Sequence, residues 1–440
     1  MPGAILFDQS ETAYRMGTGV ATYARNLAVA ARGIGFQVDA LMSADVTIDP
    51  ADPILSEVRL YDTPKLPLLP WLEPISSAMN GVFRAPFGYR PSLLARAGTV
   101  MRDTAETPPF GQTFVQRRLF NAARAHFHVY GRLAQVALPA APALFHATHP
   151  LPVRVASCPN IVTIHDLVPL RLPYMTLDNK RYFYRLIRKH LAAADHIVTV
   201  SEYTKQDIIT LFNVPEARIT NTYQAVNLPA AMVARPDDDV AGEVANLFGL
   251  DRGEFYLFIG ALEPKKNVVR LIDAYAASGS RRPLVIAGGQ GWQNEADLER
   301  MRDPRFSDYR IADATISRVD RVRRISYLPF SQLVSLMRSA RALLFPSLFE
   351  GFGLPVLEAM SLGTPVMTSN VTSLPEVAGD AAVLVDPRDV AAMAGAIRRL
   401  DNDGDLLGEL SARGRLQAAK FSMSQYETRL RGVYDRVLNG

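Results

Sequence analysis

Short, predominantly apolar runs recur along the chain, separated by stretches in which apolar residues return every three or four positions. The clearest runs lie at residues 4–7, 36–42, 160–164, 255–259 and 342–345. Runs of this length predict buried strands, and the periodic stretches after them predict amphipathic helices. Strands that alternate with helices indicate an α/β fold built on parallel sheets.

The length of the chain indicates two domains. Its 440 residues exceed what a single hydrophobic core usually supports. The periodic pattern breaks down at residues 228–253, where alanines, prolines and three consecutive aspartates at 237–239 occur. We therefore expect an N-terminal domain at residues 1–235, a C-terminal domain at 236–420 and a final helix at 421–440. The aspartates are expected to lie in the linker and to cap the next helix rather than bind a metal.

Composition excludes several classes of protein. Hydrophobic residues make up 48% of the chain and charged residues 21%, which is ordinary for a globular protein. The single cysteine, Cys158, excludes an internal disulfide and a cysteine-built zinc site, and it favours a reducing compartment. The chain opens on an apolar strand with no basic region before it, so we expect no secretory leader and a cytoplasmic location.

The net charge of +4 and the isoelectric point near 9.1 are mildly basic. This charge is compatible with a phosphate-rich ligand or an anionic membrane surface. No motif and no dense basic patch points to nucleic acid.

Two segments bear on membrane contact. Residues 133–153 carry no Asp, Glu, Lys or Arg and are long enough to span a bilayer. Four prolines within them would break a spanning helix, so we expect no transmembrane segment. Residues 177–193 have the pattern of a basic amphipathic helix. The favoured interpretation is that the basic face of this helix is exposed to solvent. The alternative is that it makes peripheral contact with the inner face of the membrane.

The most informative stretch follows the apolar run at 342–345. Its residues predict, in order, a loop that holds Glu350, a glycine turn, and a short helix that holds Glu358 near its start. Pro355 suits the first turn of that helix, where a missing N–H costs little. Gly363 suits its end.

The chemistry of this stretch suits a nucleotide sugar. The free N–H groups and the positive dipole end of the helix form a site for phosphate. A carboxylate beside that site would not bind phosphate, but it accepts hydrogen bonds strongly from hydroxyl groups. A ligand with phosphate in the middle and hydroxyls on both sides, such as ribose and a hexose, matches this arrangement.

Polar residues also follow other predicted strands. His165 and Asp166 come directly after the run at 160–164, and in open parallel sheets ligands bind at the carboxyl ends of strands. Lys266 follows the run at 255–259 and precedes a helix, where a lysine can meet a diphosphate as a point charge. Either side chain could instead be an ordinary structural or surface residue.

A glycine pair, Gly17 and Gly19, follows the first predicted strand and precedes a helix. The order of strand, glycine turn and helix is that of a phosphate-binding loop. It lacks the third glycine of the dinucleotide fingerprint, and such a turn is equally often a tight connection.

Three motifs give the chain a resemblance to a known family. Residues 346–360 with 363–366 resemble Pro-Ser-x-x-Glu-Gly-Phe-Gly-Leu-Pro-x-x-Glu-Ala-Met followed by Gly-Thr-Pro-Val, the signature of the family 4 retaining glycosyltransferases (glycosyl transferases group 1). Residues 162–167 are similar to the family's Val-x-x-His-Asp-Leu, and residues 260–267 to its Gly-x-x-Glu-Pro-x-Lys-Asn. The resemblance covers nearly all of the second domain and scattered elements of the first. It implies the GT-B architecture, in which two Rossmann-like domains face a cleft and a C-terminal helix packs back on the first domain.

For the second domain, the resemblance implies contacts to the donor. Glu350 would contact a sugar hydroxyl and stabilise an oxocarbenium-like centre, and Glu358 would bind the ribose. Lys266, on the loop that begins at Gly260, would neutralise the leaving diphosphate with no metal needed. Ala261 departs from the pattern, because many members have Arg or Thr there, so one usual phosphate contact is missing. Backbone amides of the glycine turn would hold the sugar and phosphate: those of Phe352, Gly353 and Leu354.

For the first domain, the resemblance implies that His165 contacts the donor sugar. Asp166 ranks second, as a residue that orients His165 or holds its loop. Gly17 and Gly19 would face the donor and acceptor. Residues 50–130 match the family least; we expect acceptor specificity there, with a purely structural excursion as the alternative.

The resemblance implies a retaining, metal-independent hexosyltransferase that uses a nucleotide sugar and no further cofactor. An overall resemblance to mannosyltransferases of surface polysaccharide synthesis favours GDP-mannose over UDP-sugars as donor. The acceptor would be a saccharide or a polyprenyl-linked saccharide, as in surface polysaccharide synthesis. The alternatives are an epimerase, which acts on a nucleotide sugar without an acceptor, and a non-catalytic sensor. Phosphorolysis is disfavoured because no lysine can be assigned to a pyridoxal phosphate.

Overall fold

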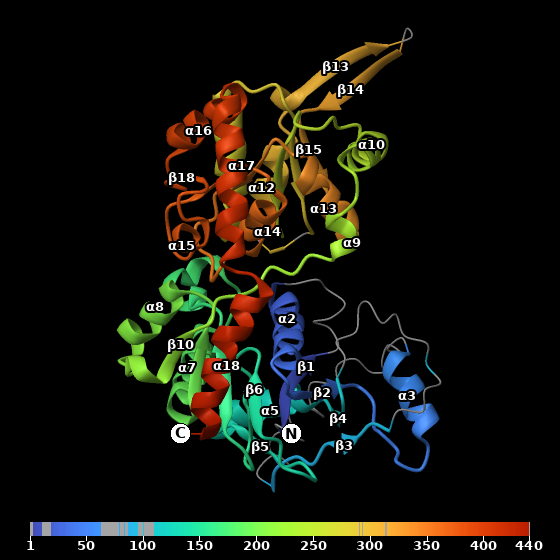
Figure 1. Cartoon of the computed structure of the whole chain (residues 1–440), viewed down its shortest axis with the longest axis vertical. Coiled ribbons are helices and arrows are strands. Elements are labelled where there is room, and N and C mark those ends of the chain that lie inside the picture. Colours follow the sequence, from blue (N-terminus) through green and yellow to red (C-terminus); the bar gives the residue numbers. More distant parts are fainter. Residues whose placement is uncertain are drawn as a thin grey trace. The chain divides into compact units, whose positions relative to one another are not determined.

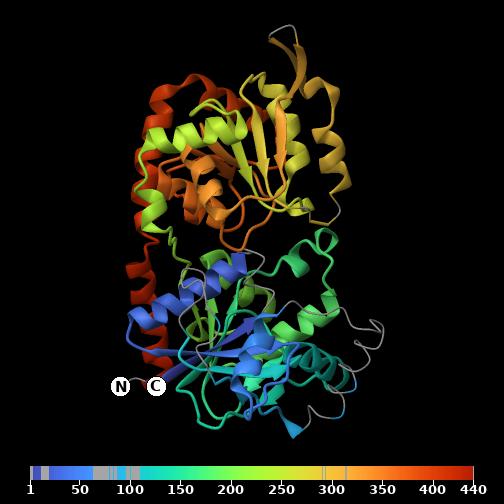
Figure 2. The ribbon, with the colours of Figure 1, turned by 90° about the vertical axis from the view of Figure 1, so that its right-hand side faces the viewer.

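The computed structural model describes residues 3–10, 19–62, 79, 83, 87–95, 100, 110–289, 291–292, 294–312 and 315–439. The chain divides into two compact units (Figures 1 and 2). The N-terminal unit comprises Met1–Leu170, Asp178–Ala225 and Met423–Gly440, and the C-terminal unit comprises Arg171–Leu177 and Val226–Ser422. The chain passes into the C-terminal unit at Val226, earlier than the boundary that the sequence pattern places at residue 236.

An eight-stranded sheet forms the centre of the N-terminal unit. Its strand order is β10-β9-β8-β6-β1-β2-β4-β3, and every neighbouring pair is parallel except β3 with β4. A separate short pair, β5 with β7, is also parallel. The strands of this unit are β1 (Ala4–Ser10), β2 (Gln37–Ala44), β3 (Ser92–Leu93), β4 (Thr113–Arg117), β5 (Ala134–Val136), β6 (Leu144–Ala147), β7 (Val153–Val155), β8 (Asn160–Ile164), β9 (His196–Thr199) and β10 (Ile219–Asn221).

A six-stranded, all-parallel sheet forms the centre of the C-terminal unit, with the order β15-β12-β11-β16-β17-β18. An antiparallel hairpin, β13 with β14, is separate from it. The strands are β11 (Tyr256–Ile259), β12 (Leu284–Ala287), β13 (Ser307–Ala312), β14 (Thr315–Asp320), β15 (Val322–Ile325), β16 (Ala342–Phe345), β17 (Val366–Ser369) and β18 (Val383–Val385). All five apolar runs singled out in the sequence contain strands, which confirms the α/β interpretation.

Helices connect the parallel strands and lie on both faces of each sheet (Figure 2). The strands are accordingly buried on both faces, which explains why they read as continuous apolar runs. The helices are α2 (Gly19–Gly33), α3 (Pro53–Tyr61), α5 (Leu119–Tyr130), α6 (Val168–Arg171), α7 (Lys180–Ala193), α8 (Glu202–Phe212), α9 (Ala230–Val233), α10 (Asp237–Phe248), α11 (Val268–Ser278), α12 (Glu295–Met301), α13 (Phe330–Ser339), α14 (Leu354–Leu362), α15 (Leu374–Ala378), α16 (Val390–Asn402), α17 (Gly404–Ala419) and α18 (Met423–Asn439).

The strand order reverses between β1 and β6 in the first sheet and between β11 and β16 in the second. In open α/β sheets, ligands bind beside the carboxyl ends of the strands that flank such a reversal. Topology therefore selects one place in each unit where functional side chains are expected.

A buried chain of hydrogen bonds holds the last helix in the N-terminal unit. The hydroxyl of Tyr434 on α18 lies 2.9 Å from Nδ1 of His146 on β6. The other ring nitrogen of His146 lies 2.9 Å from Oγ1 of Thr163 on β8, which lies 2.8 Å from the hydroxyl of Tyr23 on α2. Burial lowers the pKa of His146 to about 3, so this imidazole is neutral. The final helix of the chain thus joins α2, β6 and β8.

The expected linker position of the aspartates at 237–239 is wrong. They form the first turn of α10, where the helix dipole favours acidic side chains. The Asp237 carboxylate pairs with Arg252 at 2.8 Å and with Arg338 on α13 at 2.5 Å. The prolines before the aspartates interrupt the helical pattern there. The helix begins directly after them, so the aspartates do not lie in a linker.

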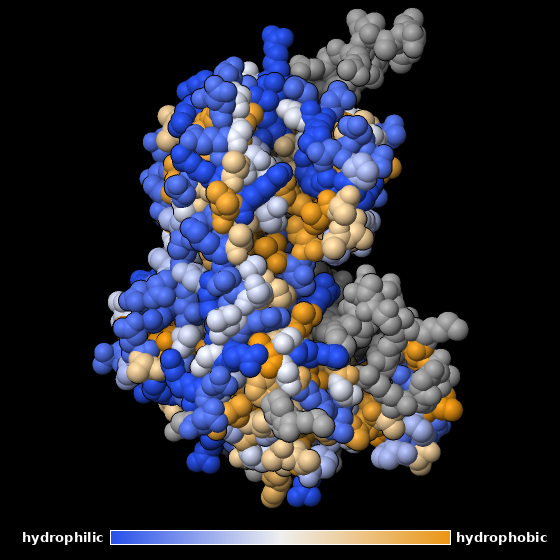
Figure 3. All heavy atoms as spheres, in the orientation of Figure 1, coloured by the Kyte–Doolittle hydropathy of each residue, from blue (hydrophilic) through white to orange (hydrophobic). Residues whose placement is uncertain are grey.

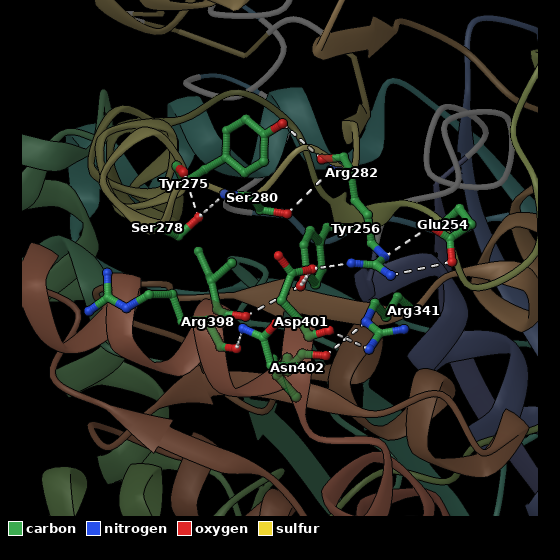
Figure 4. Close-up of polar contacts among 12 residues, drawn as sticks. Glu254, Tyr256, Tyr275, Ser278, Ser280, Arg282, Arg341, Arg398, Asp401 and Asn402 are labelled. Carbon is green, nitrogen blue, oxygen red and sulfur yellow. Dashed lines mark hydrogen bonds and ion pairs between the residues drawn. The ribbon is translucent and has the colours of Figure 1, made fainter.

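Polar side chains brace the amino ends of three strands in the C-terminal unit (Figure 4). Asp401 on α16 accepts hydrogen bonds from the Tyr256 hydroxyl at 2.8 Å and from the Arg282 guanidinium at 2.7 Å. Arg341 donates to the carbonyl oxygens of Leu400 and Asp401, both at 2.8 Å. These partners stand at or just before the starts of β11, β12 and β16, so the opposite, carboxyl edge remains available for chemistry.

No helix in the described ranges is both long and apolar enough to cross a membrane. The proline-containing run at 133–153 contains the short strands β5 and β6 and ends at the first residue of β7. The basic stretch predicted at 177–193 forms α7, which begins only at Lys180, after the capping side chain of Asn179. On the face shown in Figure 3, hydrophilic residues predominate and hydrophobic ones are interspersed among them.

Candidate functional site

The signature stretch folds as its residues predict. β16 leads into the loop that holds Glu350, and α14 begins at Leu354 with proline in its first turn. Gly353 precedes the helix with φ +113°, and Gly363 ends it with φ +80°. A Cβ at Gly353 would also lie 2.8 Å from Cδ2 of Leu374. Glycine is therefore required at the turn that aims the start of α14.

Lys266 and Glu350 meet at the reversal point of the second sheet. Lys266 follows β11, Glu350 follows β16, and Nζ of Lys266 lies 2.7 Å from Oε1 of Glu350. The ammonium also lies 4.9 Å from the ring centroid of Phe345. Burial alone would raise the pKa of Glu350, but the charges of Lys266 and Lys265 and the hydrogen bond from Lys266 outweigh it and lower the pKa. The pair therefore presents an ionised carboxylate and a cation side by side.

Three side chains that the sequence did not single out hold this loop. The Thr372 hydroxyl accepts from the backbone N–H of Glu350 at 3.2 Å. The Ser373 hydroxyl lies 2.9 Å from the carbonyl oxygen of Glu350 and 2.8 Å from that of Phe352. Buried Asn267 donates to the carbonyl oxygens of Pro346 at 3.0 Å and Pro387 at 2.7 Å. Asn267 ends the Gly-x-x-Glu-Pro-x-Lys-Asn motif, so its place in that motif was the available signal.

Glycines bring the loops after β11 and β12 together. A Cβ at Gly288 would lie 2.0 Å from the carbonyl oxygen of Gly260, and a Cβ at Gly291 would lie 2.3 Å from that of Leu262. A Cβ at Gly260 would meet the Lys266 side chain at 3.5 Å. That distance is an ordinary van der Waals contact, so glycine at 260 is favoured by its φ of +152° and not by lack of space.

Glu358 lies in α14, one turn from its start, and differs from Glu350 in its surroundings. In the described part of the chain, its carboxylate has no hydrogen-bond or ion-pair partner. Burial raises its pKa to about 7. A partly buried carboxyl group without a partner beside a helix N-terminus is suited to a ligand that brings hydroxyl donors.

In the N-terminal unit, His165 directly follows β8. Its Nε2–H donates to the carbonyl oxygen of Thr148 at 2.8 Å, and the ring of Tyr23 packs edge-on with a centroid distance of 4.7 Å. Burial lowers the pKa of His165, so the ring is neutral and Nδ1 is a hydrogen-bond acceptor. Asp166 accepts from the N–H of Val168 at 3.0 Å and so holds the loop before α6. This hydrogen bond ties Asp166 to its own loop and not to the His165 ring.

The other predicted positions of the N-terminal unit are only partly described. Gly19 is the first residue of α2, whereas Gly17 lies outside the described residues. Most of the stretch from 63 to 109, within the expected acceptor region, also lies outside them. Among the residues that the structure does describe, no three His, Cys, Asp or Glu side chains are grouped to hold a metal ion.

Family models match large parts of both units. The model described as Glycosyl transferases group 1 matches residues 248–417. The model described as Glycosyltransferase Family 4 matches residues 83–228.

Curated relatives include several mannosyltransferases. The chain is 34% identical over 279 residues to O-antigen chain mannosyltransferase B of Escherichia coli, covering 62% of this chain and 69% of that protein. It is 32% identical over 270 residues to the serotype-specific mannosyltransferase WbdA of E. coli, covering 60% of this chain but only 31% of WbdA. It is 26% identical over 250 residues to O-antigen chain mannosyltransferase RfbU of Salmonella typhimurium, covering 57% of this chain and 63% of that protein.

Solved structures share the fold. Sucrose-phosphate synthase from Thermosynechococcus elongatus matches with a TM-score of 0.63 and 19% identity, covering 99% of each chain. Anabaena HepE in complex with UDP and glucose matches with a TM-score of 0.63 and 13% identity, covering 99% of this chain and 100% of that one. At these identities the likeness bears on the fold alone.

Proposed function

Because the chain belongs to the group 1 glycosyl transferases of glycosyltransferase family 4 and has their GT-B fold, we propose that it transfers mannose from a nucleotide-sugar donor to a saccharide acceptor in surface polysaccharide synthesis. Transfer retains the configuration at the anomeric carbon and uses no metal ion. The single observation that carries this proposal is the Lys266–Glu350 pair at the reversal point of the second sheet.

The pair supplies the two charges that transfer needs. Negative charge develops on the leaving diphosphate, and Lys266 neutralises it. Positive charge develops at the anomeric carbon, and the ionised carboxylate of Glu350 stabilises it. The same carboxylate accepts a hydrogen bond from a sugar hydroxyl. The second lysine of the loop, Lys265, lies 3.7 Å from Glu263, and Ala261 brings no charge. Lys266, which lies beside Glu350 at the reversal point, is our choice of principal cation for the diphosphate, and Lys265 is the alternative.

The rest of the donor is bound by α14 and the turn before it. The amides of Phe352, Gly353 and Leu354 hold the sugar and phosphate at the positive end of the helix. Glu358 accepts hydrogen bonds from the ribose hydroxyls, and its lack of a partner among the described residues supports this role. His165 offers Nδ1 to a hydroxyl of the donor sugar.

GDP-mannose is our choice of donor, supported by the similarity to O-antigen chain mannosyltransferases. A polyprenyl-linked saccharide at the inner face of the membrane is our choice of acceptor. The basic face of α7 supports such a peripheral location, because Lys180, Arg181, Arg185, Arg188 and Lys189 all lie on that helix.

A thermal-shift panel of GDP-, UDP-, ADP- and dTDP-sugars tests the donor. A ligand at about a hundred times its dissociation constant adds roughly 2.7 kcal/mol of stability, so one class of base should raise the Tm clearly above the others. GDP-mannose should then give a glycosyl product only when acceptor is present. Conversion of the donor without acceptor would favour an epimerase, and no shift with any donor would contradict the proposal.

A further inference from the structure

The reversal point of the first sheet holds a polar cluster that none of the motifs includes. Asp8 lies near the carboxyl end of β1, and Thr148 and His149 directly follow β6. β1 and β6 are the two strands between which the strand order reverses. The cluster thus occupies the same topological place in the N-terminal unit that Lys266 and Glu350 occupy in the C-terminal unit.

Asp8 is only 4% exposed, and its carboxylate is bound on both oxygens. The backbone N–H of Thr148 donates to Oδ1, and the Thr148 hydroxyl donates to Oδ2 at 2.9 Å. Nδ1 of His149 lies 3.2 Å from the same Oδ2 and 3.2 Å from Oγ1 of Thr148. Both of these oxygens accept from the ring, because the hydroxyl proton is already directed at Asp8.

These contacts fix the tautomer of His149. Since both neighbours of Nδ1 are acceptors, Nδ1 carries a proton, which leaves Nε2 as the ring nitrogen that can accept a hydrogen bond. Within the part of the chain that the structure describes, Nε2 has no partner. The His149 side chain is 32% exposed, whereas Asp8 is buried. A buried carboxylate that orients a partly exposed imidazole is the arrangement used to hold a hydroxyl group in nucleophilic reactions.

Thr148 joins this cluster to His165. Its carbonyl oxygen accepts from Nε2–H of His165, while its N–H and hydroxyl bind Asp8. The ends of β6 and β8, which are neighbours in the sheet, therefore carry two imidazoles that are each held through one ring nitrogen, which leaves the other nitrogen to face a ligand. His165 is assigned to the donor sugar above, so Nε2 of His149 is available to a different ligand.

We propose that the Asp8–His149 dyad binds the acceptor saccharide, with Nε2 of His149 accepting a hydrogen bond from the hydroxyl that receives the sugar. This inference rests on the proposed function. His149 contacts the substrate, and Asp8 is a positioning residue that fixes the imidazole through Nδ1. The dyad orients the hydroxyl and polarises its O–H bond towards the ring.

Transfer from GDP-mannose to methyl α-mannoside, used as the acceptor probe, tests the role of His149. His149→Gln should lower kcat/KM for the probe about tenfold or more, because a hydrogen bond and the orientation it provides are lost. The Kd of GDP-mannose and the slow release of mannose to water should stay within twofold of wild type. The matched control is His128→Gln, an exposed histidine on α5, which should leave all three quantities unchanged. Unchanged transfer by His149→Gln, or an equal loss of donor affinity, would overturn the assignment.

Asp8→Asn tests the positioning role with a readout that simple destabilisation does not produce. The amide can donate to Nδ1, which moves the ring proton to Nε2 and removes the acceptor. In spectra of 15N-histidine-labelled protein, wild-type His149 should carry its proton on Nδ1, and Asp8→Asn should reverse this. Transfer should fall as in His149→Gln, with donor Kd retained. A wild-type ring protonated on Nε2 would contradict the proposal.

The same spectra separate this inference from the proposed function. If no nucleotide sugar shifts the Tm, the proposed function fails, but methyl α-mannoside can still be titrated into the labelled protein. Movement of the His149 Nε2 resonance, absent in Asp8→Asn, would support a saccharide site at the dyad. No movement with saturating probe would overturn it even if donor binding and transfer are found.

Discussion

At the scale of single residues, the two signature glutamates have opposite environments. Glu350 is paired with Lys266 and has a lowered pKa, whereas Glu358 has a pKa raised to about 7 by burial. Two carboxyl groups whose pKa values are pushed apart serve different purposes. The first stays ionised at the reacting centre, and the second is open to hydroxyl donors.

Removal of the Lys266 charge should lower the rate of transfer severely. Lys266→Ala should lower transfer about a hundredfold or more, since it removes the cation that meets the developing charge on the diphosphate. Steady-state kinetics with GDP-mannose measures this. Lys205→Ala, which removes an ammonium paired with Glu202 and Glu216 on the surface of the other unit, is the matched control. Full activity in Lys266→Ala would contradict the diphosphate assignment.

Glu358 should make stability depend on pH. Its folded pKa of about 7 lies above the ordinary value of 4.5, so the folded state keeps a proton that the unfolded state has released. The free energy of unfolding should therefore fall as pH rises from 4.5 to 7, by at most about 1.4 kcal/mol per pH unit, and level off above pH 7. Denaturant titrations should show this slope reduced in Glu358→Gln and kept in Glu299→Gln, an exposed control. An identical slope in both variants would show that Glu358 does not cause it.

At the scale of elements, the glycine turn before α14 decides where the helix dipole points. Gly353→Ala should destabilise the protein by about 1–3 kcal/mol, because φ is +113° and a Cβ would meet Leu374 at 2.8 Å. Donor binding should weaken with it, since the turn amides move. The control is Gly404→Ala at the first residue of α17, where a Cβ meets nothing within 4 Å. Equal Tm values for both variants would contradict this account of the turn.

At the scale of the whole molecule, the chain returns to its first unit through α18. Tyr434→Phe keeps the packed ring but leaves His146 without its Nδ1 partner, so it should cost about 1–3 kcal/mol of the free energy of unfolding. Chemical denaturation measures the loss, and Tyr327→Phe, at a residue that is 84% exposed, serves as the control. A Tyr434→Phe variant as stable as wild type would show that the hydrogen-bond chain does not hold α18.

The sequence by itself determined the local elements and the family. Apolar runs located five strands, Pro355 and Gly363 located both ends of α14, and the motif order carried the resemblance. These features are local, because periodicity, helix ends and turns depend on residues a few positions apart. The predicted linker position of the aspartates at 237–239 is the exception. Prolines mark a break in the pattern, but they do not determine how soon the next helix begins.

Only the tertiary structure decided which side chains meet. Lys266 and Glu350 are 84 positions apart, and Asp8 and Thr148 are 140 apart. Each pair meets because strands distant in the sequence become neighbours where the strand order reverses, and no local pattern encodes that order. The tautomer of His149 follows from the same long-range packing, which is why the sequence motifs alone did not show it.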